Sequence, residues 1–108
     1  MKLIWNVYIE DFNKKCIKTY NIFEHYSFKR ELFETYNEFK GDKDKFLSRV
    51  KQLLQYYYWS KCEWEIILSD WPPSKKFNEM KISVYDQIEN NWHIFSEYIW
   101  NNRDSIEP

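Results

Sequence analysis

The amino-acid sequence predicts an α+β fold, with three helices packed on a small, mainly antiparallel sheet of three to four strands in the order β-β-α-α-β-(β)-α. Two kinds of pattern predict this class. Hydrophobic residues alternate with period two near the start and in the middle of the chain, as strands do, and recur at steps of three and four in three other stretches, as amphipathic helices do. No repeat or linker interrupts the 108 residues, so residues 1–108 are predicted to form a single domain.

The chain begins with a predicted pair of antiparallel strands. Residues 2–10 alternate with period two and carry β-branched and aromatic side chains on the apolar face. The polar segment 11–15 suits a hairpin connection, and residues 16–22 form a second, weaker strand. The apolar face of the first strand carries Leu3, Trp5, Val7 and Ile9.

Two amphipathic helices are expected next. The first begins at Ser27, a favourable N-cap residue, and ends at Gly41, where glycine takes a left-handed backbone at little cost. The second begins at Asp42 or Asp44 and runs to Tyr58, so the two form a helical hairpin. Their apolar faces carry Phe28, Leu32, Tyr36 and Phe39 in the first helix, and Phe46, Val50, Leu53 and Tyr57 in the second.

Residues 59–69 have the most regular alternation in the chain and predict a third strand, on which the helices would pack. Pro72 and Pro73 would stop this strand because proline has no amide hydrogen for a ladder. The predicted core face carries Cys62, Trp64, Ile66 and Leu68, and the outer face carries Glu63, Glu65, Ile67 and Ser69.

The last part of the chain is predicted to be mainly helical. After a polar loop over residues 74–80, residues 81–85 form a brief fourth strand or an extended lead-in. A third helix is expected over 86–102, followed by a frayed tail from Asp104. The apolar face of this helix carries Ile88, Trp92, Phe95 and Ile99.

Composition excludes several classes of function. A single glycine, Gly41, cannot build a P-loop or a dinucleotide-binding turn. Cys16 and Cys62 are far apart and form no CxxC pair, so no zinc site is expected. A net charge of -1 makes no general case for nucleic acid or membrane, although the first half of the chain is net basic and the second net acidic. No apolar run reaches the length of a membrane span. We therefore expect a cytoplasmic protein without a cofactor.

Side chains with potential chemistry have simpler interpretations. The two histidines, His25 and His93, are expected at the surface. Paired carboxylates can bind Mg²⁺ or act as acid and base, but they are also typical of a solvated strand face or of an acidic partner-binding surface. The carboxylates expected near one end of the sheet are Glu63, Glu65, Asp70 and Asp86. No group of residues predicts catalysis.

Aromatic residues make up 21% of the chain, which is more than a small core easily hides. The densest cluster is the run 56–59, and Trp71 precedes two prolines. Tyr and Trp are favoured anchors of protein interfaces, whereas stacking on nucleic-acid bases also requires a basic groove. We predict a protein-interaction site formed by Tyr56, Trp59, Glu63, Glu65, Ile67, Asp70 and Trp71.

The second half of the chain resembles small uncharacterised proteins of low-GC Gram-positive bacteria, their phages and mobile elements. The resemblance rests on WSKCEWEIILS at 59–69 and WPP at 71–73, then on ISVYDQI at 82–88, NW at 91–92 and YIW at 98–100. It brings no catalytic motif. It implies a short accessory protein that acts by stoichiometric binding, including as an inhibitor of a host defence system such as a CRISPR nuclease.

The function expected is therefore that of a non-enzymatic protein-binding accessory protein, similar to an anti-CRISPR inhibitor. One alternative is a small metal-dependent enzyme that uses the carboxylates named above. The other alternative is a nucleic-acid-binding accessory protein that uses Lys14, Lys15, Lys18, Lys29, Arg30, Lys45, Arg49 and Lys51.

A homodimer is also possible, because Ile94, Tyr98 and Trp100 lie off the apolar stripe of the last helix.

Overall fold

A computed structural model describes residues 2–10, 16–68 and 73–107. It confirms the predicted pair of antiparallel strands, which are β1 (Asn6–Glu10) and β2 (Cys16–Asn21), although the first strand begins at Asn6 and not at residue 2 as expected. The Trp5 carbonyl accepts a hydrogen bond of 3.0 Å from the Ile22 amide at the open end of the pair. Alternate residues of β1 face the core, as the sequence pattern requires. The hairpin connection predicted at 11–15 lies outside the described residues.

The first helix forms as predicted, but its two ends differ from the expectation. A short 3₁₀ turn, η1 (Ile22–Glu24), leads into α1 (Tyr26–Glu38), and His25, not Ser27, is the N-cap residue. At the other end the helix stops at Glu38, and the Gly41 backbone is not in the left-handed region. The predicted glycine cap is therefore wrong, and residues 39–41 form an ordinary turn.

The second helix begins as predicted and continues further. The carboxylate of Asp42 accepts a hydrogen bond of 3.1 Å from the Lys45 amide, which caps α2 (Lys43–Leu68). The strand predicted at 59–69 is therefore wrong, because residues 59–68 are the last turns of this helix. Of the residues predicted to end the strand, Asp70 and Trp71 lie outside the described part of the chain.

The helix continues because its second half keeps a buried stripe with helical spacing. Val50, Leu54, Tyr58 and Cys62 follow one another at steps of four, and all four are buried. No glycine or proline occurs in α2 to interrupt its hydrogen bonds. The strand pattern and the helix pattern both bury Cys62, so this cysteine is in the core as predicted. They differ at Trp64, which is 59% exposed.

The third helix is also longer than predicted. It is α3 (Pro73–Asn101), so the loop expected at 74–80 and the strand expected at 81–85 are both helix. Proline is well suited to the first turn of a helix, where its missing amide hydrogen has no partner to lose. The described residues therefore contain a sheet of two strands, not three to four. The predicted apolar face is confirmed at Ile88, Phe95 and Ile99.

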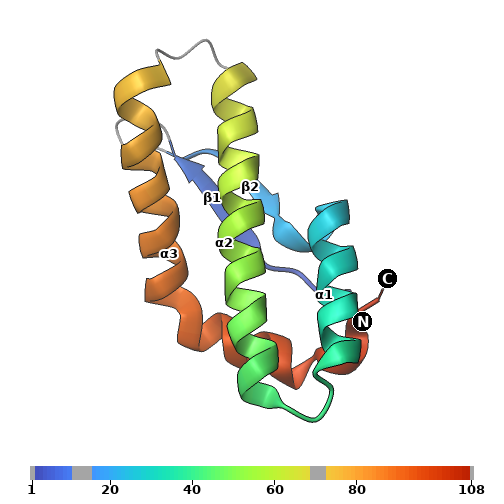
Figure 1. The fold of residues 1–108 in the computed structure, drawn as a ribbon. Helices are drawn as coiled ribbons and strands as arrows, with labels where there is room; N and C mark the ends of the chain where they lie inside the picture. The colour runs from blue at the N-terminus through green and yellow to red at the C-terminus, as the bar shows by residue number, and fades with distance from the viewer. Residues whose placement is uncertain (1, 11–15, 69–72, 108) are drawn as a thin grey trace.

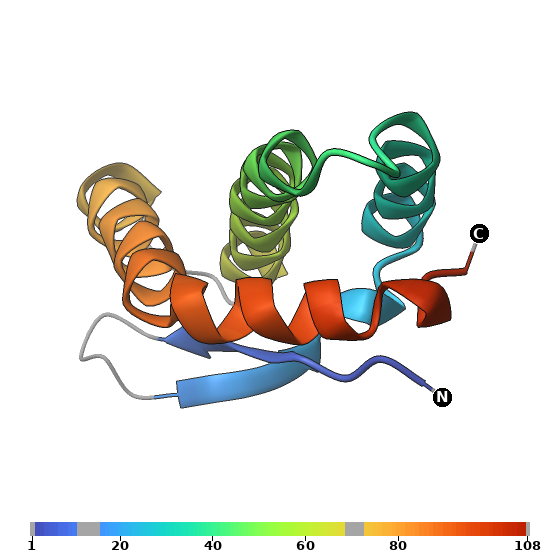
Figure 2. The same cartoon turned by 90° about the horizontal axis from the view of Figure 1, so that it is seen from below.

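The helices lie on one side of the hairpin, with α2 between α1 and α3, as Figures 1 and 2 show. The C-terminal part of α3 changes direction and runs across the end of the molecule where α1 ends and α2 begins (Figure 2). Trp100 on this segment packs against Phe46 of α2, with ring centroids 5.9 Å apart. A second 3₁₀ turn, η2 (Arg103–Ser105), follows. A frayed tail was predicted from Asp104, but Ile106 is buried, so this prediction is wrong for the described part of the tail.

The hydrophobic core fills the space between the helices and the hairpin, and α2 contributes most to it. Among its largest fully buried side chains are Tyr58, Phe28, Phe46 and Phe95. No helix in the described ranges combines the length and the hydropathy that a membrane span requires.

Candidate functional site

The predicted interaction residues now lie on a helix. Tyr56, Trp59 and Glu63 are spaced at i, i+3 and i+7 on α2, so they share one side of it. Tyr56 and Glu63 are exposed, whereas Trp59 is partly buried against the core. The structure therefore brings these three predicted residues together. The side chain of Ile67, like Asp70 and Trp71, lies outside what the structure describes.

Glu65, another of the predicted interaction residues, is paired with two lysines. Its carboxylate accepts a hydrogen bond of 2.8 Å from Lys18 of β2 and lies 3.4 Å from the ammonium group of Lys61, one helical turn away. The hydrogen bond from Lys18 and the neighbouring Lys61 lower the pKa of Glu65, although its burial acts in the opposite direction. Glu65 thus joins α2 to the hairpin, and it is not a free acidic group.

Two exposed aromatic residues that sequence reasoning missed lie beside the predicted ones. Trp64 was predicted to be buried, and Tyr26, the first residue of α1, was not considered. Both border a hollow between the start of α1 and the second half of α2. The helical phase of Tyr58 and Cys62 would have indicated that Trp64 faces outward. The residues that line the hollow are Tyr20, His25, Tyr26, Ser60, Lys61, Glu63 and Trp64.

A second hollow continues this surface along the line between α1 and α2. Its lining includes Tyr56 and Tyr57, whose ring centroids lie 4.9 Å apart, and Glu31, which accepts a hydrogen bond from the Tyr57 hydroxyl. The Tyr57 ring in turn lies 4.9 Å from the ring of His25, which borders the first hollow. We call the surface formed by His25, Tyr26, Tyr56, Tyr57 and Trp64 the α1–α2 aromatic groove.

Burial of the Tyr57 ring and the hydrogen bond to Glu31 together raise the pKa of its hydroxyl to about 12, and burial is the larger cause. The hydroxyl is therefore protonated at physiological pH and remains a donor to Glu31. This bond fixes α1 against α2 at the centre of the groove. The floor of the groove is consequently set by the packing of two helices and not by a mobile loop.

His25 connects the groove to the stability of α1. Its Nδ1 accepts a hydrogen bond of 3.5 Å from the Phe28 amide, which is possible only when this nitrogen is unprotonated. Burial lowers the pKa of His25, and the nearby Lys61 lowers it further. This histidine, predicted to be a surface residue, is half-buried.

The folded protein should therefore lose stability as the pH falls below 6.5, the usual pKa of histidine. Because the pKa is lowered by folding, the unfolded chain takes up the proton first, so this contribution is fully present above 6.5 and is lost below it. His25→Asn keeps a capping side chain without a titrating group. Urea unfolding from pH 7.5 to 5.5 should show a fall in the wild-type midpoint that the variant lacks. An equal fall in both proteins would contradict a role for His25.

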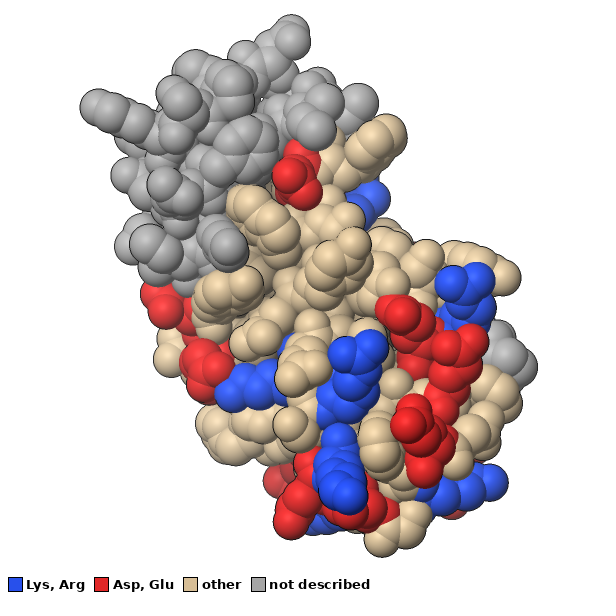
Figure 3. All heavy atoms as spheres, viewed as in Figure 1, with Lys and Arg blue, Asp and Glu red and all other residues tan. Residues whose placement is uncertain are grey.

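Charges of both signs are mixed on the face that Figure 3 shows. Lys, Arg, Asp and Glu gather over its lower half, while uncharged side chains cover much of its middle. Of the basic residues considered for nucleic-acid binding, several are already paired. Lys18 pairs with Glu65, Lys45 lies 3.9 Å from Asp42, and Lys51 lies 2.7 Å from Glu89.

The cysteines and carboxylates do not assemble into a reactive site among the described residues. Burial raises the pKa of Cys62 to about 12, so its thiol is protonated, and the other cysteine, Cys16, is exposed on β2. No group of three His, Cys, Asp or Glu side chains in residues 2–10, 16–68 and 73–107 lies close enough to hold a metal ion. Asp86, one of the predicted carboxylates, is exposed on α3.

No protein-family model, curated protein or solved structure matches this chain.

Proposed function

We propose that this chain is a non-enzymatic binding protein that holds a protein partner on the α1–α2 aromatic groove. One observation carries the proposal. The three most exposed large hydrophobic side chains in the described part of the chain are Tyr26 at 73%, Tyr56 at 66% and Trp64 at 59%, and all three border this groove. Exposed aromatic residues gathered on one surface are typical of an interaction site.

The chemistry of the groove fits a protein partner. Tyr and Trp contribute most of the binding energy in many interfaces, because they bury a large apolar area and also offer a hydrogen-bond donor. Polar and charged side chains border the same hollows, among them Lys61, Glu63 and Arg49. An apolar centre with a polar rim is the usual anatomy of a protein interface.

The resemblance of residues 59–100 to accessory proteins of phages and mobile elements supplies a setting for this activity. In that setting the partner is a component of a host defence system, and the chain inhibits it by occupying its surface, as an anti-CRISPR protein does. The partner would then lie in the cytoplasm of the host cell. A nucleic-acid partner is less well supported, because Lys18, Lys45 and Lys51 are each paired with a carboxylate.

The test is affinity purification of the full chain from a lysate of a low-GC Gram-positive bacterium, followed by mass spectrometry. A matched variant, Tyr26→Ser/Tyr56→Ser/Trp64→Ser, should unfold at nearly the wild-type urea concentration because all three side chains are exposed. It should bind the captured partner at least about 30-fold more weakly, as expected for the loss of interface hot spots worth about 2 kcal/mol.

The control variant is Ile94→Ser, which removes a half-exposed apolar side chain from α3, away from the groove. It should bind the partner as the wild type does. Recovery of the chain alone at every salt concentration would contradict the proposal, as would equal binding by the wild type and the triple variant. A gel shift with DNA or RNA that weakens steeply with salt would instead favour the nucleic-acid alternative.

A further inference from the structure

One edge of β1 has no neighbouring strand among the residues that the structure describes. In an antiparallel pair, alternate residues direct both their N–H and their C=O toward the partner strand. Trp5 bonds Ile22 through its carbonyl, and the register continues with Val7 opposite Tyr20 and Ile9 opposite Lys18. The backbone groups of Asn6 and Tyr8, which lie between these residues, therefore point away from β2.

Side chains from α2 and α3 satisfy only the two ends of this free edge. The Ile4 amide donates a hydrogen bond of 2.9 Å to the Tyr98 hydroxyl at one end. The Tyr8 carbonyl accepts from the Tyr58 hydroxyl at the other end, with the Gln87 side-chain amide beside it. Between these ends, the Asn6 N–H, the Asn6 C=O and the Tyr8 N–H make no hydrogen bond with any described residue.

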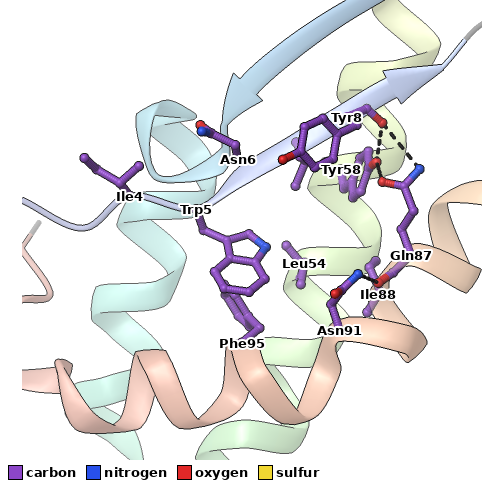
Figure 4. A pocket seen from close by; sticks show the side chains of 11 residues that line it. Ile4, Trp5, Asn6, Tyr8, Leu54, Tyr58, Gln87, Ile88, Asn91 and Phe95 are labelled. Carbon is purple, nitrogen blue, oxygen red and sulfur yellow. Dashed lines mark hydrogen bonds between the residues drawn. The ribbon is translucent and has the colours of Figure 1, made fainter. Parts of the chain in front are cut away.

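A cavity of about 320 Å³ follows this edge. Figure 4 shows it between β1 and α3, with side chains of α2 behind it. Leu54, Ile88 and Phe95 provide apolar surface, and the indole N–H of Trp5 makes no hydrogen bond with a described residue. The residues from Ile4 to Tyr8 form one wall, and none of the lining residues carries a formal charge.

We propose that this cleft binds an extended, uncharged segment of a partner polypeptide, which adds to β1 as a third strand. Donors and acceptors that alternate along a strand edge are complementary to one kind of ligand, an extended polypeptide backbone. Side chains of the added strand would alternate as well. One would enter the apolar surface of Leu54 and Ile88, and its neighbours would lie beside the exposed side chains of Ile4 and Tyr8.

The geometry favours a free segment over a second copy of this chain. The β1 edge is recessed, because α3 stands beside it and reaches it through Gln87 and Tyr98. In a dimer paired through β1, each copy would bring its own α3 to the point where the two edges must meet. A segment that is unpaired on both of its edges has no such obstacle. The cleft also shares no lining residue with the α1–α2 aromatic groove, so this proposal does not depend on the proposed function.

The test selects ligands for the full chain from a displayed library of random linear peptides of about ten residues, the upper length of most strands. Enriched peptides should carry apolar residues at alternate positions and little charge. Asn6→Pro removes one free donor, and a proline fits an edge position whose N–H faces away from the ladder. It should weaken binding of a synthetic enriched peptide by at least about tenfold. Thr19→Pro is the control, because Thr19 lies opposite Tyr8 and directs its N–H away from β1.

Two measurements separate strand addition from simple apolar binding. Binding of the peptide should slow amide exchange at Asn6 and Tyr8, whereas Val7 and Ile9 should exchange slowly with and without it. N-methylation along the peptide should abolish binding at every second residue only, because the others point away from β1. Faster exchange at Val7 in Asn6→Pro would show that this substitution disturbs the hairpin. In that case Asn91→Trp is the variant to use, because it blocks the cleft from the exposed side of α3 and leaves β1 unchanged.

Failure to enrich any peptide over the blank surface would overturn the proposal. So would binding that is unchanged in both Asn6→Pro and Asn91→Trp, or N-methylation that acts equally at all positions. The triple variant of the α1–α2 aromatic groove should bind the selected peptide as the wild type does. Loss of peptide binding in that variant alone would place the peptide in the groove and reject the cleft.

Discussion

Tyr58→Ala should lower the free energy of unfolding by about 3–5 kcal/mol, the cost of removing a large buried aromatic side chain. Tyr58 is 1% exposed at the point where α2 faces β1 and α3. Its hydroxyl donates to the Tyr8 carbonyl, and burial raises its pKa, so it stays protonated and remains a donor. The substitution leaves both a cavity and a carbonyl without its main donor. Urea unfolding followed by tryptophan fluorescence measures the loss.

Trp64→Ala is the matched control, because it removes a larger aromatic side chain from the same helix at an exposed position. Its free energy of unfolding should stay within about 0.5 kcal/mol of the wild type. A strand over 59–69 would reverse this order, since its core face would carry Trp64. A larger loss for Trp64→Ala than for Tyr58→Ala would therefore contradict the helical structure of this segment.

Phe95→Ala should also cost about 3–5 kcal/mol, because Phe95 holds the crossing segment of α3 against the start of the chain. Its ring centroid lies 5.0 Å from that of Trp5, 6.1 Å from that of Phe23 and 5.9 Å from that of Trp92. These contacts join residues before β1, the η1 turn and α3. The shift of the urea midpoint, with the slope of the transition compared, gives the loss.

The control for this substitution is the neighbouring residue in the chain. Ile94 is half-exposed, so Ile94→Ala should change the unfolding free energy by about 0.5 kcal/mol or less. The same small effect for Phe95→Ala would show that the crossing segment does not need this ring. Because Phe95 also lines the cleft beside β1, its loss should weaken peptide binding there.

The elements with one dominant pattern were predicted from the sequence. Residues 2–10 alternate and have turn residues after them, and the β1–β2 pair forms there. The apolar faces of α1 and of the first half of α2 follow helical spacing, and Phe28, Leu32, Phe46 and Val50 are buried as expected. In these segments local preference and the final packing agree, so no knowledge of distant residues was needed.

The candidate site was predicted only at the positions where the local sequence pattern and the final packing agree. Tyr56 and Glu63 are exposed on α2 under either pattern. Trp64 was assigned to the core because alternation placed it with Cys62, and Tyr26 lies at a helix start that becomes part of a surface only when α2 packs beside it. Glu65 appeared to be a free acidic group until β2 placed Lys18 next to it.

By itself the sequence determined that the chain is α+β, that it begins with a hairpin, and which faces of its first two helical stretches are apolar. Only the tertiary structure decided the secondary structure of residues 59–68, because these residues satisfy both a strand pattern and a helix pattern. The helix forms because it carries the buried stripe of Leu54 and Tyr58 on to Cys62, in the same core cluster as Val84 and Ile88 of α3. Local alternation cannot reveal that benefit, because the free energy comes from apolar surface buried against residues far along the chain.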